Sequence, residues 1–260
     1  MGETLGARFL TRVSLRPERV PTYDEFPYGI PFVRGLDLTF RSPVTYLVGE
    51  NGTGKSTLVE AIAEACGFPV AGGSRNEASV RYGAERRSAL GHALRFGFAR
   101  RPRDGYFFRA ELQAHFASLL DERRQDPDFL GDPYARYGGR SLHARSHGEA
   151  FLAVMLNRME SGMFVMDEPE AALSPQRQLA LLVRMADLIA QGTAQFIVAT
   201  HSPILLTFPD ANIVSFDQAP LRSVTLEETS HYRITRGILE APELYWRRLL
   251  NDETSSDSSG

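Results

Sequence analysis

The sequence Gly49-Glu50-Asn51-Gly52-Thr53-Gly54-Lys55-Ser56 matches the phosphate-binding pattern G-x-x-x-x-G-K-[ST] at every fixed position. Lys55 is the only lysine in the chain of 260 residues, and the other 28 basic residues are arginines. A compact ammonium group on a flexible stem can reach between two phosphate groups, which suits lysine better than the planar guanidinium of arginine. The stretch therefore predicts a nucleotide-binding loop in which Lys55 contacts phosphate.

The neighbours of this loop supply the strand and the helix that the motif needs. Residues 44–48 form a short apolar run typical of a buried parallel strand, and residues 56–66 carry apolar side chains at helical spacing before Gly67. Backbone N–H groups and the positive end of the helix dipole would then face one anion, and the Ser56 hydroxyl can ligate Mg²⁺. The residues expected to bind the nucleotide here are Asn51, Gly52, Thr53, Gly54, Lys55, Ser56 and Thr57.

A second apolar run, Met163-Phe164-Val165-Met166, ends in Asp167 and Glu168. A strand buried on both faces would place Asp167 at the carboxyl edge of a parallel sheet, where such sheets bind ligands. Asp167 is then expected to hold Mg²⁺ through water, and Glu168 to polarise the water that attacks the terminal phosphate. The alternative is an acidic pair that only caps the next helix.

Three further elements narrow the class of nucleotide-binding protein. Ser146-His147-Gly148-Glu149 precedes an amphipathic helix, and Ser174-Pro175 has the composition of a helix N-cap followed by the first helical position. Residues 196–200 form another apolar, β-rich run that leads directly into His201. We expect this run to be a buried strand that delivers His201 to the edge where Asp167 lies.

In this order the motifs resemble the head of ABC-type ATPases over about residues 5–250. Within that class, residues 167–176 and 199–203 resemble the small single-domain ATPases of the AAA_21/AAA_15-like group, related to chromosome-maintenance and DNA-repair heads. The resemblance implies an α/β P-loop fold with a mostly parallel core sheet flanked by helices, an N-terminal antiparallel β layer and a helical lobe. It also implies that Ser146 and Gly148 bind the γ-phosphate held by a second subunit.

The same resemblance assigns His201 as the switch histidine that contacts the γ-phosphate. Two positions depart from the family pattern. The transporter signature is Leu-Ser-Gly-Gly-Gln, whereas this chain has His147 and Glu149 around Gly148, and Ser174 stands where the family usually has Asp. The segment between the phosphate loop and the signature is too short for the long coiled-coil arms of chromosome-maintenance heads.

We expect a single domain over residues 1–250. Residues 5–70 and 160–250 would form its core, residues 71–159 a helical signature lobe, and the Ser- and Asp-rich residues 251–260 a disordered tail. The lone Cys66 ends an apolar helical face, so it is expected in the core and forms no intrachain disulfide.

Near the N-terminus, residues 9–15 and 36–40 alternate like strands of an antiparallel layer, joined by the Pro-rich residues 17–31. That loop could pass near the adenine. The residues placed by position to contact adenine are Arg12, Tyr23 and Phe32, and the alternative is that they serve packing alone.

Residues 106–110 are typical of a strand, and Glu111 or Gln113 follows where the family has a metal- and water-sensing side chain. Glu111 is the candidate metal ligand of this pair. The alternative is that both residues only begin the next helix.

The charge is uneven along the chain. The formal net charge is -3, but residues 75–109 hold nine arginines against three acidic residues. This segment is a solvated face, a phosphate-sensing lobe or a nucleic-acid surface. The N-terminus lacks a signal-peptide pattern, and no uncharged apolar run approaches the roughly 20 residues that span a bilayer, so we expect a cytoplasmic protein.

The resemblance implies ATP and Mg²⁺ as cofactors and ATP hydrolysis by a homodimer that sandwiches two ATP molecules. Lys55, Glu168 and His201 would be catalytic, and Ser56, Asp167 and Glu111 would serve the metal. We expect a mechanochemical switch in DNA-related or defence processes with a further protein partner. The alternatives are a subunit of an ABC transporter, a slow ATP-gated module that binds nucleic acid or protein, and a P-loop kinase.

Overall fold

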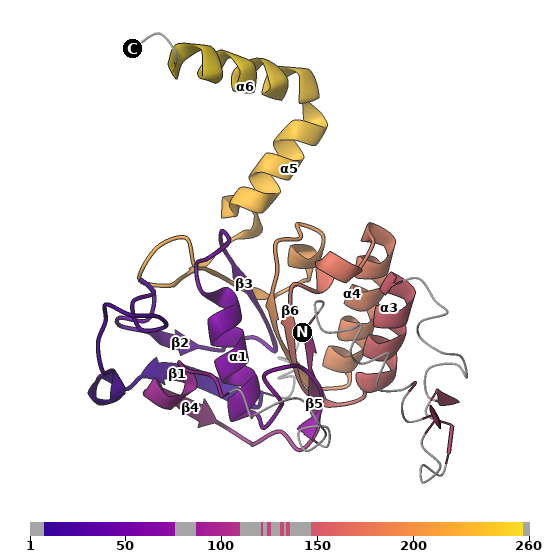
Figure 1. The fold of residues 1–260 in the computed structure, drawn as a ribbon. Coiled ribbons are helices and arrows are strands. Elements are labelled where there is room, and N and C mark those ends of the chain that lie inside the picture. The colour runs from indigo at the N-terminus through magenta and orange to yellow at the C-terminus, as the bar shows by residue number, and fades with distance from the viewer. Residues whose placement is uncertain are drawn as a thin grey trace.

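The computed structural model describes residues 8–75, 87–109, 121, 124–125, 131–132, 134–135 and 147–256. The described chain forms two β-sheets with helix α1 between them, and helices α3 and α4 cover the far side of the larger sheet (Figure 1). The fold is therefore the layered α/β architecture that the sequence predicted.

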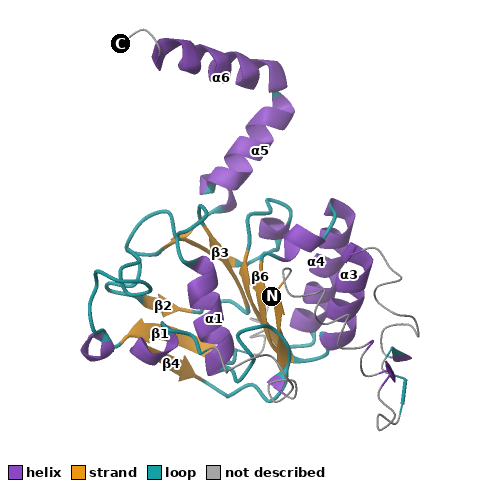
Figure 2. Ribbon diagram, in the orientation of Figure 1, coloured by secondary structure: helices purple, strands orange, loops and turns teal. Residues whose placement is uncertain are grey.

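The larger sheet carries the functional strand ends. Its six strands lie in the order β5-β6-β7-β3-β8-β9, and all neighbouring pairs are parallel except β8 with β9. Figure 2 shows the strands in orange, with β3 and β6 labelled. The strands are β3 (Val44–Val48), β5 (Gly105–Arg109), β6 (Gly162–Asp167), β7 (Ala194–Ala199), β8 (Asn212–Ser215) and β9 (Arg222–Val224). Since β3, β6 and β7 are adjacent and parallel, the phosphate loop, the acidic pair and His201 follow neighbouring strands at one edge.

The smaller sheet is the expected N-terminal antiparallel layer. Its order is β2 (Asp37–Thr39), β1 (Leu10–Leu15), β4 (Leu94–Phe98). Strand β4 corrects the expected helical lobe, because it lies within residues 71–159 and pairs with β1. The alternation of Leu94, Phe96 and Phe98 is the pattern of this strand, and Arg95 within it contributes to the basic segment.

Two helical layers enclose the larger sheet. The helices are α1 (Lys55–Ala65), α3 (His147–Arg158) and α4 (Pro175–Ala190). Successive residues of β6 alternate between the faces: Phe164 and Met166 pack in the cluster that contains α3 and α4, whereas Met163 and Val165 pack in the cluster that contains α1. Cys66 is 2% exposed in the α1 cluster, and burial raises the pKa of its thiol to about 12, as expected for a core residue.

Short 3₁₀-helices connect the main elements. They are Pro17–Arg19, Gly91–Ala93, Pro169–Ala172, Leu205–Thr207 and Leu226–Glu228. The buried side chain of Gln195 joins the two sheets, because its Oε1 accepts the N–H groups of Phe9 and Leu10 at 2.7 and 2.9 Å. This contact fixes the start of β1 against β7.

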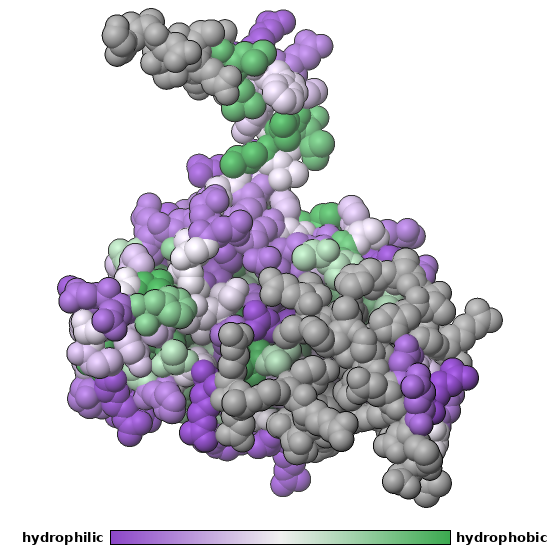
Figure 3. Space-filling model, in the orientation of Figure 1, coloured by the Kyte–Doolittle hydropathy of each residue, from purple (hydrophilic) through white to green (hydrophobic). Residues whose placement is uncertain are grey.

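The chain continues into an arm made of α5 (Ser230–Glu240) and α6 (Pro242–Ser256), which projects away from the sheets (Figure 1). Apolar side chains are exposed along the arm (Figure 3), namely Ile234, Leu239, Leu244, Trp246, Leu249 and Leu250. Helix α6 continues to Ser256, which corrects the expected disordered tail over its first residues. Once a helix has started, each added residue extends it at little cost.

Gly237 allows the two helices of the arm to approach closely. A Cβ at this position would lie 2.5 Å from Cε2 of Tyr245, so a larger residue would clash with the ring. Within the described part of the chain, no helix combines the length and the apolar character needed to cross a membrane.

Candidate functional site

The phosphate loop connects β3 to α1 and depends on glycine conformations. Gly52 and Gly54 have φ values of 81° and 92°, in the left-handed region that other residues rarely adopt. A Cβ on Gly54 would lie 2.7 Å from Cε1 of Phe32. No side chain among the described residues caps α1 at its N-terminus, so its first backbone N–H groups can bind an anion.

Lys55 lies at the centre of this loop. It is 4% exposed, and its Nζ donates to the carbonyl oxygens of Gly49 at 2.6 Å and Glu50 at 2.9 Å. Burial lowers the pKa of Lys55, and the charges of Glu168 and Asp167 oppose this shift. The ammonium group is therefore positioned between the loop and the acidic pair.

Asp217 supports the loop from β8, and the sequence analysis missed it. Its Oδ1 accepts the N–H of Glu50 at 2.9 Å, and its Oδ2 accepts the hydroxyl of Ser215 at 3.2 Å. The signal that could have found it is an acidic residue two positions after a parallel strand. Asp217 fixes the first turn of the loop through a backbone bond.

Asp167 is the last residue of β6 and faces the first turn of α1. The Ser56 hydroxyl donates to its Oδ1 at 3.0 Å, and Nη2 of Arg109 lies 3.6 Å from its Oδ2. Burial raises the pKa of Asp167 to about 6, with Arg109 and Ser56 opposing the shift. A hydroxyl and a buried carboxylate are the hard oxygen ligands that Mg²⁺ prefers, so these residues fit the expected metal.

Arg109 is a site residue that the sequence analysis assigned only to the basic segment. It ends β5 directly opposite Asp167, and its Nη1 donates to Oε1 of Glu60 in α1 at 2.6 Å. Arg109 thus connects strand β5, which carries it, with strand β6 and helix α1. Its charge belongs to the interior of the candidate site rather than to a nucleic-acid surface.

Other arginines of the 75–109 segment also pack onto the protein. Arg75 donates to the Pro102 carbonyl at 3.0 Å. The guanidinium groups of Arg100 and Arg101 lie 4.9 and 5.0 Å from the ring centroids of Phe9 and Phe98. Arg81 and Arg86 lie outside the described residues.

Glu168 adopts a strained backbone conformation next to Asp167. Its φ of 48° and ψ of 54° are left-handed, which costs a non-glycine residue about 1–3 kcal/mol. Its N–H donates to the carbonyl of Ala199 at 2.9 Å, at the end of β7. The strain turns the chain so that the Glu168 side chain, 43% exposed, is accessible at the strand edge.

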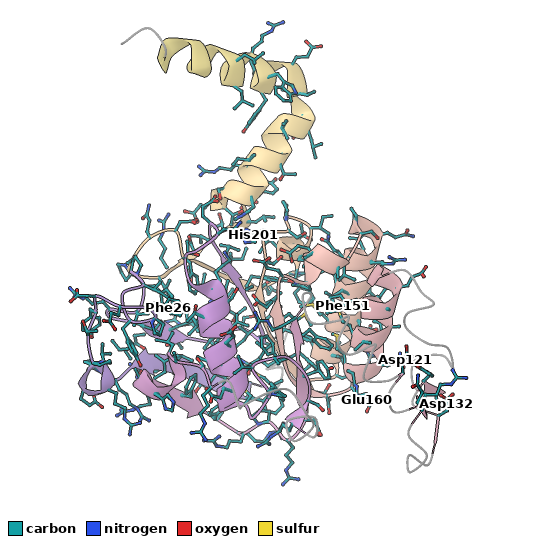
Figure 4. All side chains as sticks on the ribbon, in the orientation of Figure 1. Phe26, Asp121, Asp132, Phe151, Glu160 and His201 are labelled. Carbon is teal, nitrogen blue, oxygen red and sulfur yellow. The ribbon has the colours of Figure 1, made fainter. Side chains whose placement is uncertain are left out.

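His201 stands beside Glu168, at the edge of the core close to the base of α5 (Figure 4). Its Nε2 lies 3.5 Å from Oε1 of Glu168 and is buried with no hydrogen-bond partner among the described residues. Its Nδ1 lies 2.7 Å from Nε2 of His231. Burial, Lys55 and His231 lower the pKa of His201, so the ring is neutral at pH 7.

Glu170 fixes the backbone of His201 and was not recognised in the sequence. Its Oε1 accepts the His201 N–H at 2.5 Å. Burial raises the pKa of Glu170, and the bond from His201 opposes the shift. The short 3₁₀-helix Pro169–Ala172, which carries Glu170, therefore positions His201.

The signature segment is described only in part. Ser146 lies outside the described residues, and Gly148 lies in the first turn of α3. A Cβ on Gly148 would lie 2.6 Å from both the Ala172 carbonyl oxygen and Nη1 of Arg177, so this glycine permits close packing. Ser174 occupies the N-cap position of α4 as expected, but its side chain forms no capping bond.

The structure separates the three adenine candidates. Phe32 is 3% exposed and packs edge-on against Phe216 with centroids 4.9 Å apart, which agrees with the packing alternative. The guanidinium of Arg34 lies 4.7 Å from the centroid of the Tyr23 ring.

Arg12 lies on β1 and pairs with Asp37 through two bonds of 2.7 and 2.6 Å. The pair is exposed and holds β1 to β2. Glu111 and Gln113, the candidates for metal and water sensing, lie outside the described residues. The structure thus brings together Lys55, Ser56, Asp167, Glu168 and His201, but it does not place Arg12 with them through any described contact.

Two family models match the sequence. The model described as "AAA domain" matches residues 28–111, and the model described as "AAA domain, putative AbiEii toxin, Type IV TA system" matches residues 149–207. The first match contains the phosphate loop, and the second contains the acidic pair and His201. No curated protein matches the sequence significantly.

Several solved structures are similar to the chain at low sequence identity. "An inward-facing conformation of a putative metal-chelate type ABC transporter" is 12% identical with a TM-score of 0.50, and the match covers 87% of this chain and 88% of that chain. CbiO1 from Clostridium perfringens, part of the ABC transporter complex cbiONQ, is 15% identical with a TM-score of 0.48, covering 92% and 98%. The SMC head domain from Thermotoga maritima is 15% identical with a TM-score of 0.43, covering 84% and 98%.

The family matches and the fold agree with each other. Both matched segments carry motifs that meet at the carboxyl edge of one parallel sheet. Two segments of the chain thus match AAA-domain models, and the fold is similar to that of a putative metal-chelate type ABC transporter.

Proposed function

We propose that this chain binds ATP together with Mg²⁺ and hydrolyses ATP to ADP and phosphate. The observation that carries the proposal is the contact between the Ser56 hydroxyl and Asp167 at 3.0 Å, beside the buried ammonium of Lys55. A hydroxyl, a carboxylate and an ammonium group at a helix N-terminus are the groups that a metal-bound triphosphate requires.

Each residue has a distinct role in the proposed reaction. Ser56 and Asp167 would hold the metal, and Lys55 would bind the β- and γ-phosphates. When bound, Mg²⁺ neutralises phosphate charge and orients the phosphate oxygens. Glu168 accepts a hydrogen bond from the attacking water, and His201 donates from Nε2 to the γ-phosphate. The unpartnered, buried Nε2 of His201 supports this role.

We further infer a homodimer that closes on ATP. Helix α3 packs on the face of the larger sheet opposite to α1, so Gly148 and Lys55 lie on different sides of one protomer. A second protomer is therefore needed to bring the N-terminus of α3 to a bound γ-phosphate. His147 and Glu149 differ from the transporter signature Leu-Ser-Gly-Gly-Gln. Residues 146–149 nevertheless have the Ser-x-Gly-Glu pattern.

The experiment measures the mass of the protein in solution and its release of phosphate from ATP. We expect wild-type protein to release phosphate, and Glu168→Gln to lose release while its mass by light scattering doubles in ATP·Mg²⁺. The matched control is Glu227→Gln, which changes an exposed glutamate in the last 3₁₀-helix. A monomeric Glu168→Gln variant in saturating ATP·Mg²⁺ would contradict the dimer, and a phosphorylated acceptor without free phosphate would favour a kinase.

We infer that the ATPase serves a DNA-related or defence process rather than transport. The description of the model that matches residues 149–207 names a toxin of a toxin–antitoxin system, which supports defence. The signature also lacks the Gly-Gly-Gln of transporters. Salt-dependent binding of DNA that is lost when Arg95 and Arg103 are changed to Glu would favour a nucleic-acid role over transport.

A further inference from the structure

The two histidines His201 and His231 meet at the junction between the candidate site and the arm. His201 follows β7, His231 lies in the first turn of α5, and their facing nitrogens are 2.7 Å apart. The ring planes are inclined at 69°, with centroids 4.7 Å apart. At this distance one nitrogen carries the hydrogen and the other accepts it.

The surroundings of His201 decide which nitrogen carries the hydrogen. If His201 donated from Nδ1, its Nε2 would be a bare acceptor 3.5 Å from the acceptor oxygen Oε1 of Glu168. The bare Nε2, buried and without another partner among the described residues, would then face a second acceptor, which is unfavourable. If His231 donates instead, Nε2 of His201 carries the hydrogen and faces the Glu168 carboxylate favourably.

We propose that His231 is the positioning residue of His201: its Nε2–H donates to Nδ1 of His201 and holds the hydrogen of that ring on Nε2. This proposal rests on the proposed function where it assigns Nε2 as the donor to the γ-phosphate. The neutral His201 ring can donate to a phosphate oxygen only in this tautomer, because the other tautomer presents a lone pair. His231 thereby makes the first turn of α5 part of the nucleotide site.

The position of His231 is itself well supported. Thr229 precedes α5, and its side chain accepts the N–H of Tyr232 at 3.3 Å. Thr229 is 3% exposed, and its hydroxyl donates to the carbonyl of Leu226 at 2.7 Å. The backbone around His231 is thus anchored at both the cap and the preceding turn, while Glu170 anchors the backbone of His201.

The first test reads the tautomer directly in nucleotide-free protein. Long-range ¹H–¹⁵N correlation spectra at pH 8 distinguish hydrogen on Nδ1 from hydrogen on Nε2, and the His201 signals are assigned by their loss in His201→Gln. We expect the Nε2–H form in wild type, a mixture in His231→Ala and recovery of the Nε2–H form in His231→Gln. Glutamine can place an amide N–H close to the position of the histidine Nε2.

The second test separates turnover from binding. We expect His231→Ala to lower kcat about 10- to 100-fold with little change in KM for ATP, as for other residues that orient a reacting histidine. His231→Gln should retain most of the wild-type kcat. His92→Ala is the matched control, because His92 is an exposed histidine in the 3₁₀-helix before β4.

The outcomes are distinguishable. An Nδ1–H form in wild type, or an unchanged tautomer in His231→Ala, overturns the proposal. A changed tautomer with unchanged kcat shows that the ring is oriented without consequence for the reaction, which also overturns the positioning role. If wild type shows the Nε2–H form but releases no phosphate, the proposed function fails while the assignment of the His201 ring stands.

Discussion

The buried carboxylate of Asp167 should make the nucleotide-free protein less stable at neutral pH. Its pKa is about 6 in the folded protein, compared with an ordinary value of 3.8. Each unit of this difference corresponds to about 1.4 kcal/mol, so the ionised side chain costs the fold about 3 kcal/mol. The replacement Asp167→Asn removes the charge and retains an oxygen that can accept from Ser56.

The pH dependence has a defined sign. Because the pKa of Asp167 is raised on folding, the proton is bound in both states below about pH 4. Between about pH 4 and 6 the unfolded chain releases it first, so stability falls as the pH rises. Above about pH 6 the loss is complete, whereas the Asn variant has no such loss. We expect the variant to be more stable by about 3 kcal/mol at pH 8 and by about 1.5 kcal/mol at pH 5.

The assay is urea or thermal unfolding in EDTA without nucleotide, at pH 5 and pH 8. A gain of about 3 kcal/mol corresponds to a rise of about 6–12 °C in Tm for a chain of this size. Arg109 keeps its bond to Glu60 at 2.6 Å, so the replacement does not leave it without a partner. Asp187→Asn, on the exposed side of α4, is the control. The reasoning is refuted if the Asp167 variant is no more stable at pH 8, or if the gain is equal at both pH values.

Two further variants test the packing around the site. Gly148→Ala should lower the free energy of unfolding by about 1–3 kcal/mol in chemical denaturation, because the new Cβ would lie 2.6 Å from the Ala172 carbonyl oxygen; unchanged stability would contradict the close packing of α3. Asp217→Ala should weaken binding of a non-hydrolysable ATP analogue about 5- to 10-fold by calorimetry, because the Glu50 N–H loses its acceptor. Asp217→Asn retains that acceptor, and equal losses in both variants would argue against the backbone contact.

Local patterns were sufficient to predict the elements that bear the motifs. The strand expected over residues 44–48 is β3, and the run that ends at Asp167 is β6. Strands buried on both faces are continuous apolar runs, and a glycine-rich turn before a helix is equally local, so both are visible in a short window of sequence. His201 was predictable for the same reason, since it directly follows such a strand.

Contacts between distant segments were not predictable in this way. Arg109 lies opposite Asp167 only because β5 and β6 pair in parallel, and His231 reaches His201 only because the first turn of α5 lies beside the segment that follows β7. Neither residue stands in a motif, and each has a common alternative role on a surface. Strand β4 was missed because its alternation was short and its partner β1 lies far away in sequence.

The balance of charge at the strand ends indicates why the site should require a metal. Within the described residues the carboxylates around the site are Glu50, Glu60, Asp167, Glu168, Glu170 and Asp217, and the cations are Lys55 and Arg109. The neutral His201 adds no charge to offset them. A triphosphate would bring further negative charge beside a buried carboxylate, and such repulsion is strong where water is excluded. Free ATP should therefore bind poorly, whereas a divalent cation between Ser56 and Asp167 would convert the costly carboxylate into a ligand.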